Sequence, residues 1–374
     1  MAELYIGLMS GTSLDGVDGV LADFSNGGIA VRQHAGAPFG VHLRAELLAL
    51  NASGGGDELH RAALAGNALA RCYASVVARL LADAKLPPDA ITAIGAHGQT
   101  VRHQPGVVDG VGYTLQINNP SLLAELTHID VVADFRSRDL AAGGQGAPLV
   151  PAFHHALFGL ADQPVAVLNL GGIANLSLLP ALDGTPGTVL GFDCGPANAL
   201  MDHWCQSHRG RPFDAGGEWA ASGQVLPELL ARLLAEPYFA KSPPKSTGRD
   251  LFNPVWLAAE LGAVPGVAAA DVQATLAELT ARICAADLLR HGPSCQRLVV
   301  CGGGALNTHL LARLAALLPG VDVVLSGHQG LPPQQVEAAA FAWLARRAIR
   351  REPGNLASVT GAAGARVLGA IYPA

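Results

Sequence analysis

The sequence predicts an α/β protein built as two lobes, and three observations support this fold class. The chain has 374 residues, whereas a single hydrophobic core rarely keeps growing beyond about 250 residues. Of these residues 50% are apolar, only 14% are charged and 45 are glycines, which is typical of a globular protein with a large core and many tight turns. Short apolar segments that end in glycine-rich turns alternate with longer helical segments, as they do in α/β proteins.

The first element is a hairpin with a glycine-rich and hydroxyl-rich tip. Residues 4–9 are apolar and residues 17–24 alternate as a strand does, while GTSLDG stands between them at 11–16. Backbone N–H groups and hydroxyls in such a turn can surround an anion, and its carboxylates can help to hold a metal ion. We therefore expect a cradle for nucleotide phosphates, with a purely structural hairpin as the alternative.

The Walker A loop is a second phosphate-binding turn to consider at this position. Gly11 and Gly16 have its glycine spacing, but Val17-Asp18 replace the Lys and the Ser or Thr that the loop requires. A strand-like segment follows the turn, whereas a Walker loop opens a helix. The sequence therefore excludes that loop.

The chain continues with a helical region at 43–84 and an apolar strand at 91–95, which leads into the polar segment HGQTVRH at 97–103. A further strand at 129–133 leads into DFRSRD at 134–139. Because α/β proteins place ligand contacts at the ends of strands, we expect both polar segments to lie near a site.

The second lobe repeats the opening of the first. Strands at 165–170 and 173–179 flank the turn Gly171-Gly172, which indicates a weak internal duplication. A strand at 188–192 then ends at Asp193, and Pro196 suits the first turn of a helix.

Three further segments complete this part of the chain. A polar loop occupies 243–250, and a short buried strand at 298–300 runs into a glycine turn and a helix. An apolar stripe at helical spacing follows at 334–350. We expect the first lobe to comprise residues 1–130 and to be completed by 355–374, and the second lobe to comprise residues 131–354.

Glycine turns at strand ends recur at positions 11, 171, 195 and 302. Because glycine lets the main chain approach a ligand closely, these turns suggest that several backbone segments converge on one polyphosphate. The three glycines at 302–304 suit a flat adenine or ribose, since they fill no core and cost conformational entropy. Tight α/β loops without a ligand are the alternative reading.

Asp193 is the candidate general base. It follows an apolar strand and precedes an expected helix, a position that holds a carboxylate rigidly at a ligand site. Phosphoryl transfer needs positioning, Mg²⁺ and one carboxylate that accepts the proton of the nucleophile. A helix N-cap is an equally good reading of its position, because Asp is a favoured capping residue.

Arg136 and Arg138 are candidates for binding an anion. The planar guanidinium suits a carboxylate or a phosphate, but a solvated pair that bridges Asp134 and Asp139 fits the spacing equally well. Glu337 stands in the first turn of the last long helix, where an acidic residue is usually exposed and favoured by the helix dipole.

Bulk properties exclude several classes of partner. A net charge of −6 without a long Lys or Arg run argues against nucleic-acid binding, so we expect a small-molecule partner. The uncharged stretch 163–182 is too often interrupted by Pro, Gly and Asn to span a membrane, and nothing at the amino terminus directs export. Six scattered cysteines without metal-site spacing indicate a cytoplasmic protein with reduced thiols, and a homodimer is compatible with this composition.

Taken together, these segments closely resemble those of the anhydro-N-acetylmuramic acid kinases, bacterial enzymes of peptidoglycan recycling. The matching blocks are GLMSGTSLDGVD (7–18), GAHGQT (95–100), ADFRSRDLAAGGQGAPLVPAFH (133–154), NLGGIANLS (169–177), GFDCGPANALMD (191–202), PPKSTGRDLFN (243–253), CGGGALN (301–307) and VTGA (359–362). They follow one another from end to end, and their combination is far more specific than any single block.

The resemblance implies a two-lobed actin-like ATPase fold, of the ribonuclease H-like type, with ATP in a cleft between the lobes. The residues that it implies as contacts for ATP are Gly11, Thr12, Ser13, Leu14, Asp15, Gly16, Val17, Asp18, Gly171, Gly172, Gly302, Gly303, Gly304 and Asn307. It also implies Asp18 as a ligand of Mg²⁺, Asp193 as the catalytic base, and Arg136, His97 and Glu337 as contacts for the amino sugar.

The reaction implied by the resemblance couples two steps. Water attacks the anomeric carbon of the 1,6-anhydro sugar, the bridging oxygen leaves as the 6-hydroxyl, and that oxygen takes the γ-phosphoryl group of ATP. Two alternatives stay open at this point: another sugar or amino-sugar kinase of the same fold, and a nucleotide-switched module without sugar chemistry.

Overall fold

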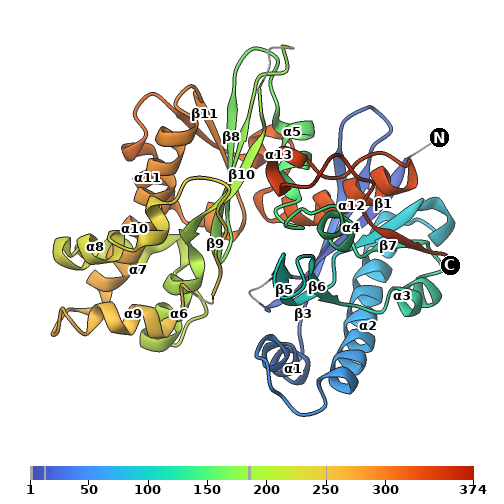
Figure 1. The fold of residues 1–374 in the computed structure, drawn as a ribbon, viewed down its shortest axis with the longest axis horizontal. Helices are drawn as coiled ribbons and strands as arrows, with labels where there is room; N and C mark the ends of the chain where they lie inside the picture. Colours follow the sequence, from blue (N-terminus) through green and yellow to red (C-terminus); the bar gives the residue numbers. More distant parts are fainter. Residues whose placement is uncertain (1–2, 12–13, 184–186, 250) are drawn as a thin grey trace. The chain divides into compact units, whose positions relative to one another are not determined.

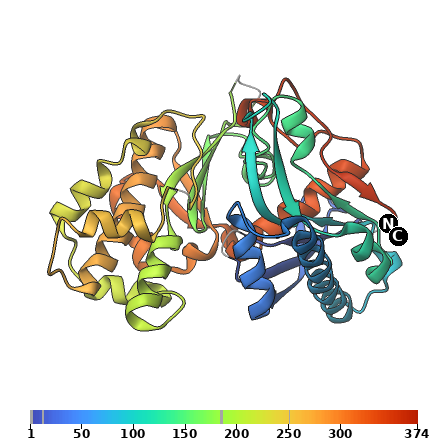
Figure 2. The ribbon, with the colours of Figure 1, turned by 60° about the horizontal axis from the view of Figure 1, so that its bottom comes forward.

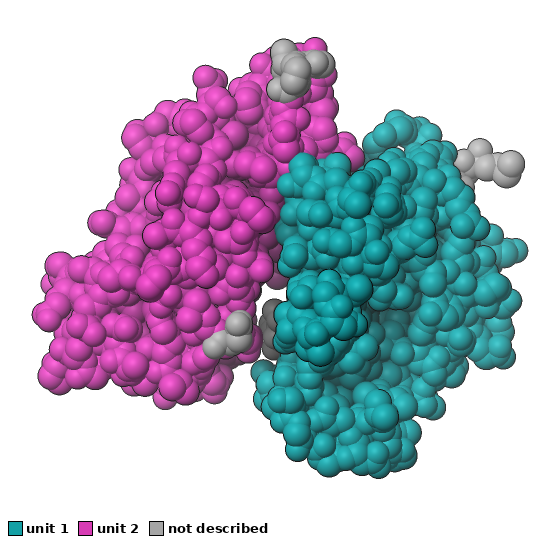
Figure 3. All heavy atoms as spheres, in the orientation of Figure 1, with its two compact units in different colours: residues 1–153, 335–374 teal, residues 154–334 magenta. Residues whose placement is uncertain are grey.

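The structure of the chain is a computed structural model that describes residues 3–11, 14–183, 187–249 and 251–374. The chain divides into two compact units (Figure 3): unit 1 is Met1–Phe153 with Gln335–Ala374, and unit 2 is His154–Gln334. None of the helices in the described ranges is both long enough and apolar enough to cross a membrane.

Unit 1, in which β1, β3 and β7 are labelled in Figure 1, is built on a mixed sheet. The strand order of this sheet is β13-β7-β4-β1-β2-β3. Its strands are β1 (Leu4–Met9), β2 (Gly16–Asp23), β3 (Ala30–Pro38), β4 (Ala93–Ala96), β7 (Val131–Ala133) and β13 (Ala370–Tyr372). The first three strands are antiparallel neighbours, β4 and β7 continue the sheet parallel to β1, and β13 closes the edge. The predicted opening hairpin is thus confirmed.

The remaining elements of unit 1 are mainly helical. They are α1 (Val41–Asn51), α2 (Glu58–Ala84), α3 (Pro120–Thr127), α4 (Ser137–Ala141), α12 (Val336–Ile349), α13 (Ala357–Thr360) and the separate hairpin of β5 (Gln99–Pro105) with β6 (Gly112–Ile117). Helix α5 (Val150–Phe158) contains the boundary between the units. Leu4, Ile6 and Leu8 share a core cluster with α2, whereas the intervening Tyr5 shares one with α12. Since alternate residues of a strand point to opposite faces, these two helices cover opposite faces of the sheet.

Helix α12 lies directly on the backbone of the sheet at two adjacent glycines. Gly7 of β1 and Gly95 of β4 are register partners. A Cβ added at Gly7 would stand 1.9 Å from the carbonyl oxygen of Ala338, and one added at Gly95 would stand 2.0 Å from that of Phe341. A glycine in a strand allows another backbone to come this close.

The unit boundaries differ from those that the sequence predicts, because residues 131–153 and 335–354 belong to unit 1. Strand β7 pairs with β4, which fixes the first of these segments. The second contains α12, which packs on β1 and β4. How the functions are divided between the lobes stays a prediction.

Unit 2 is built on a sheet with the order β10-β9-β8-β11-β12. Its strands are β8 (Val165–Leu170), β9 (Ile173–Leu179), β10 (Leu190–Pro196), β11 (Arg297–Cys301) and β12 (Asp322–Leu325). Its helices are α6 (Asn198–Arg209), α7 (Glu218–Ser222), α8 (Pro227–Leu234), α9 (Pro254–Leu261), α10 (Ala269–His291) and α11 (Thr308–Leu317). These helices gather on one side of the sheet (Figure 2), and both the strands and α10 contribute to a single large apolar cluster.

The first five strands of each sheet share one topology, and β13 is an additional edge strand of unit 1. In each, the first three strands form an antiparallel meander, and the fourth and fifth continue parallel to the first, giving the order third, second, first, fourth, fifth. This common order confirms the predicted duplication and the α/β, ribonuclease H-like fold class.

Strand β10 does not end where the sequence predicts. It continues to Pro196 with a bulge between Asp193 and Gly195, and α6 begins at Asn198 rather than at Pro196. Gly195 has a φ of 149°, and a Cβ there would stand 2.6 Å from the ring of Phe239 and 2.7 Å from the Ile283 side chain. The N-cap residue is Ala197, so the reading of Asp193 as a helix cap is wrong.

The close contact at Gly7 generates a stability prediction. Gly7→Ala should lower the free energy of unfolding by about 1–3 kcal/mol or more, because the methyl group overlaps backbone that cannot rotate away. Gly28→Ala is the matched control, since a Cβ there meets nothing within 4 Å, and it should change stability by less than about 0.5 kcal/mol. Equal denaturation curves for the two variants would contradict the packing argument.

Candidate functional site

The turn between β1 and β2 is fastened to the segment that follows β4. The Ser10 hydroxyl donates to the carbonyl oxygen of Gly98 at 3.0 Å and lies 3.1 Å from the Tyr73 hydroxyl, which accepts from the Gly98 N–H. The buried Gln99 side chain donates to the carbonyl oxygen of Gly11 at 3.1 Å. The start of the predicted turn, at Ser10 and Gly11, therefore lies beside Gly98 and Gln99 of the second predicted polar segment.

Within this turn the described residues have different roles. Leu14 is buried with a φ of 56°, and its N–H donates to Gly11 O at 3.2 Å. A Cβ at Gly16 would stand 2.4 Å from the Ala37 carbonyl, so β3 packing alone requires that glycine. Val17 is in the core, while Asp15 is exposed. Thr12 and Ser13 lie outside the described residues.

Asp18 lies on β2, beyond the turn. Its side chain is 57% exposed and stands 3.3 Å from His34 Nε2. Among the described residues there is no group of three or more His, Cys, Asp or Glu side chains placed to hold a metal ion. An exposed carboxylate such as that of Asp18 is the kind of ligand that Mg²⁺ takes singly, with phosphate oxygens and water as its other ligands.

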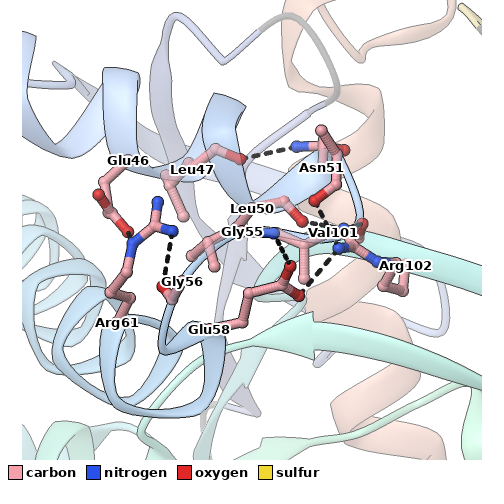
Figure 4. Close-up of polar contacts among 11 residues, drawn as sticks. Glu46, Leu47, Leu50, Asn51, Gly55, Gly56, Glu58, Arg61, Val101 and Arg102 are labelled. Carbon is pink, nitrogen blue, oxygen red and sulfur yellow. Dashed lines mark hydrogen bonds and ion pairs between the residues drawn. The ribbon is translucent and has the colours of Figure 1, made fainter.

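Arg102, further along HGQTVRH, makes its contacts with α1 and α2. Arg102 donates to the carbonyl oxygens of Leu50 and Ala52 at the end of α1 and pairs with Glu58 at 3.1 Å (Figure 4). Because last-turn carbonyls of a helix lack intrahelical partners, Arg102 caps α1 and joins it to α2. Arg102 therefore anchors β5 to these two helices.

The three residues predicted to contact a sugar are gathered in unit 1. Arg136, in the segment before α4, donates to His97 Nε2 at 2.9 Å through Nη2 and to the Gly146 carbonyl at 2.7 Å. Burial lowers the pKa of Arg136 to about 10, opposed by the charges of Glu337 and Asp139, so it is cationic at neutral pH. The alternative prediction, that Arg136 bridges Asp134 and Asp139 in solvent, is therefore wrong, because its guanidinium bonds His97 and Gly146. Arg138, in contrast, is exposed.

The histidines beside Arg136 are neutral. Burial, reinforced by the charge of Arg136, holds the pKa of His97 well below its usual range and lowers that of His103 to about 4. A neutral imidazole can accept a hydrogen bond from the guanidinium, which an imidazolium could not. The cation Arg136 is therefore balanced by the carboxylates of Glu337 and Asp139.

Asp139 holds the surroundings of Arg136 in place. This fully buried carboxylate accepts from Gly146 N at 2.7 Å, Asn355 Nδ2 at 2.6 Å and Thr360 Oγ1 at 2.8 Å. It thereby links the 143–146 loop, which bonds Arg136, to the C-terminal segment. The sequence offered Asp139 only as a surface partner of arginine.

In unit 2 two of the three predicted glycine turns, those at 171 and 302, lie next to each other. A Cβ at Gly302 would stand 2.3 Å from Asn169 Oδ1, and one at Gly304 would stand 2.7 Å from the Leu170 side chain, so packing requires both glycines. Added Cβ atoms at Gly171, Gly172 and Gly303 would meet nothing closer than 3.5 Å. At these three positions the intramolecular packing leaves room, as a ligand cradle would need.

Backbone and side-chain hydrogen bonds organise these turns. The N–H groups of Ala197 and Asn198 at the start of α6 donate to Gly172 O and Gly171 O, each at 3.0 Å. Asn307 caps α11, with its side-chain oxygen accepting from Leu310 N at 2.9 Å. The amide nitrogen of Asn307 places two N–H donors beside this cap.

Asp193 is held on both sides. Its Oδ1 accepts from Asn175 Nδ2 of β9 and its Oδ2 from the Thr247 N–H, both at 3.0 Å. Burial raises the pKa of Asp193, opposed by these two hydrogen bonds and by the charge of Lys245. Neither Asn175 nor Thr247 was singled out from the sequence, because a polar side chain and a loop N–H carry no signal until the fold brings them to the carboxylate.

Known proteins are similar to this chain over its full length. A family model described as anhydro-N-acetylmuramic acid kinase matches residues 3–374. The chain is 74% identical over 374 residues to an anhydro-N-acetylmuramic acid kinase of Variovorax paradoxus (strain S110), covering 100% of this chain and 99% of that protein. It is 62% identical over 390 residues to one of Albidiferax ferrireducens (strain ATCC BAA-621 / DSM 15236 / T118), covering 100% of both. Among solved structures, the activator of the 2-hydroxyisocaproyl-CoA dehydratase from Clostridium difficile with bound ADPNP has a TM-score of 0.46 and 14% identity, over 91% of this chain and 93% of that chain.

The charge of Arg136 generates a titration prediction. Arg136→Ala should raise the pKa of His103 from about 4 toward the ordinary value of about 6.5, because a neighbouring cation disfavours imidazolium. The measurement is an NMR titration of the imidazole C–H signals. Arg138→Ala removes the same charge two residues away and should leave His103 unchanged; equal shifts in both variants would refute the assignment.

Proposed function

The chain belongs to the anhydro-N-acetylmuramic acid kinase family, and from this premise we propose that Asp193 is the base of its reaction. The chain is accordingly an ATP-dependent amino-sugar kinase of peptidoglycan recycling. The observation that carries the proposal for Asp193 is a carboxylate that is fixed through both oxygens and has a raised pKa.

The proposed chemistry balances around that carboxylate. Water adds to the anomeric carbon of the 1,6-anhydro ring, the bond from that carbon to the bridging oxygen breaks, and the released oxygen at carbon 6 takes the γ-phosphoryl group. The proton of the attacking water passes to Asp193 and then to solvent. The products are N-acetylmuramic acid 6-phosphate and ADP.

The environment of Asp193 suits a base for water. A carboxylate oxygen that accepts one hydrogen bond has a second lone pair with which to take a proton. The donors, Asn175 Nδ2 and Thr247 N–H, do not titrate, so the geometry is retained whichever state the carboxyl is in. The raised pKa makes the carboxylate more basic than an ordinary Asp, which favours proton transfer.

We assign the lactyl carboxylate of the sugar to Arg136. Arg136 is a cation, and its hydrogen bonds to His97 and Gly146 set the orientation of its guanidinium. The planar donors of a guanidinium suit a charge-assisted bond to a carboxylate. Glu337, whose charge acts on Arg136, is assigned to a sugar hydroxyl, and His97 to holding the guanidinium.

ATP is the phosphoryl donor, and we assign its phosphates to the turn Gly11–Asp18 and to Gly171-Gly172, and its adenosine to Gly302–Gly304 and Asn307. The room at Gly171, Gly172 and Gly303 supports this assignment. Mg²⁺, held by Asp18 and by phosphate oxygens, would neutralise charge that develops on the transferred group. A cytoplasmic location and a homodimer stay predictions from the sequence.

The base assignment predicts the behaviour of Asp193→Asn. This variant should lose about a hundredfold to ten-thousandfold of sugar-dependent turnover and keep its ATP affinity, since an amide retains the shape but accepts no proton. Turnover is measured as N-acetylmuramic acid 6-phosphate by mass spectrometry, and ATP affinity by calorimetry. The exposed Asp162 provides the control, because Asp162→Asn makes the same change away from Asp193.

The wild-type enzyme should also lose kcat/KM with falling pH at a higher pH than an ordinary Asp would set, because the base must be ionised and its pKa is raised. Retention of more than roughly a tenth of the activity by Asp193→Asn would reject the base assignment, since general-base losses are far larger.

A further inference from the structure

A buried ion pair lies behind the loop that holds Asp193. Lys245 Nζ stands 2.9 Å from Asp287 Oδ1 and 2.8 Å from Oδ2, and the two side chains are only 1% and 7% exposed. Lys245 belongs to the loop 243–249, and Asp287 is on α10. The pair therefore joins this loop to the central helix of unit 2.

Five contacts connect Lys245, its loop and the two rings around its ammonium to Asp193 or to the residue before it. The Asp193 N–H donates to the Lys245 carbonyl at 3.2 Å, and the Thr247 N–H donates to the Asp193 carboxylate. The Lys245 ammonium lies over the rings of Phe192, at 5.5 Å, and Tyr238, at 5.3 Å. The Tyr238 hydroxyl in turn donates to the Asp193 carbonyl at 2.7 Å.

We propose that the Lys245–Asp287 ion pair is a positioning device for Asp193, fixing loop 243–249 on β10 so that the Thr247 N–H is aimed at the carboxylate. The inference rests on the proposed function, because it takes Asp193 to be the base. Lys245 and Asp287 act through Asp193 and its loop rather than on the sugar.

A contribution to folding stability does not by itself explain why two charged side chains are buried here. Two buried charges are costly to desolvate, and a well-packed apolar pair of similar volume is often as stable or more so. An apolar pair would not fix the orientation of the loop as this ion pair does. The Lys245 ammonium bonds both carboxylate oxygens of Asp287 and is also held by two aromatic faces. Such fixation matters for a base, because a displacement of about 1 Å can cost about a hundredfold in rate.

The pair also supplies charge beside Asp193. Lys245 lowers the pKa of Asp193 and so opposes the effect of burial. The other groups that face this region are Asn175 from β9, Thr247 from the loop, Tyr238, the thiols of Cys194 and Cys284, and Asp287 with His291 from α10. The pKa of His291 is lowered, mainly by burial, and burial raises those of Tyr238 and Cys194, so these three are neutral near pH 7.

The test compares Lys245→Met with Lys241→Met in the full-length enzyme. Both remove one ammonium near Tyr238, but Lys241 is exposed and lies 5.5 Å from that ring. Lys245→Met should lower kcat at least about tenfold, leave ATP affinity unchanged, and move the acid limb of the kcat profile to higher pH. Lys241→Met should match the wild type in all three measurements.

A double variant separates positioning from folding. Lys245→Met leaves Asp287 buried without its cation, whereas Lys245→Met/Asp287→Leu leaves neither charge, so the double variant should recover thermal stability. Its kcat and pH profile should nevertheless remain those of Lys245→Met. If the double variant regains the wild-type kcat and acid limb together with stability, the pair is structural and the inference is overturned.

Failure of the inference can be distinguished from failure of the proposed function. An inactive Asp193→Asn together with a wild-type profile for folded Lys245→Met overturns the positioning role and leaves Asp193 as the base. An active Asp193→Asn overturns both.

Discussion

The structure depends on close approaches of helices to strands that only glycine permits. In unit 1, Gly7 and Gly95 bring α12 onto β1 and β4, and Glu337 stands in the first turn of that helix beside Ala338, whose carbonyl faces Gly7. In unit 2, Gly195 brings β10 against Ile283 of α10. Asp193 precedes that glycine by two residues, and Asp287 lies one turn beyond Ile283. In both units a glycine thus allows a helix to pack closely on a strand near side chains to which we assign a role in the reaction.

The duplicated strand order explains where the candidate groups lie. The β1–β2 turn corresponds to the β8–β9 turn at Gly171-Gly172, because both connect the first two strands of a meander. The segment at His97 follows β4, and Gly302 follows β11, the corresponding fourth strands. The residue directly after the fourth strand is thus the polar His97 in unit 1 and Gly302 in unit 2. Under the proposed function this difference separates sugar recognition from nucleotide recognition within one architecture.

The sequence predicts the positions of helices and strands better than it predicts which polar side chains are buried. The two hairpins, β11 and α12 follow from apolar runs, alternation and glycine turns, which are local properties of the chain. The start of α6 was missed, because Pro196 favours a helical first turn locally, but the packing of Gly195 against Phe239 and Ile283 extends β10. Lys245 stood in a segment that reads as an ordinary polar loop. Its partner Asp287 is 42 residues away in the sequence, so only the fold reveals the buried pair.

The same limit applies to Arg136, whose spacing fitted a solvated ion pair as well as a ligand contact. Its bonds to His97 and Gly146 come from tertiary packing, which no local pattern encodes. Asp193 could be proposed as a base from the sequence, because it ends an apolar run and belongs to a specific block, and that role stays a prediction. The hydrogen bonds that fix its carboxylate could not be predicted.

Reaction in oxygen-18 water tests the central claim most directly, namely that water activated at Asp193 opens the ring and the released oxygen is phosphorylated. The product is trapped quickly, and unlabelled product incubated for the same time corrects for exchange of the anomeric hydroxyl. The account predicts label in the anomeric hydroxyl and none in the phosphate group or its ester oxygen. Label in the ester oxygen or in inorganic phosphate, without label at the anomeric carbon, would contradict it.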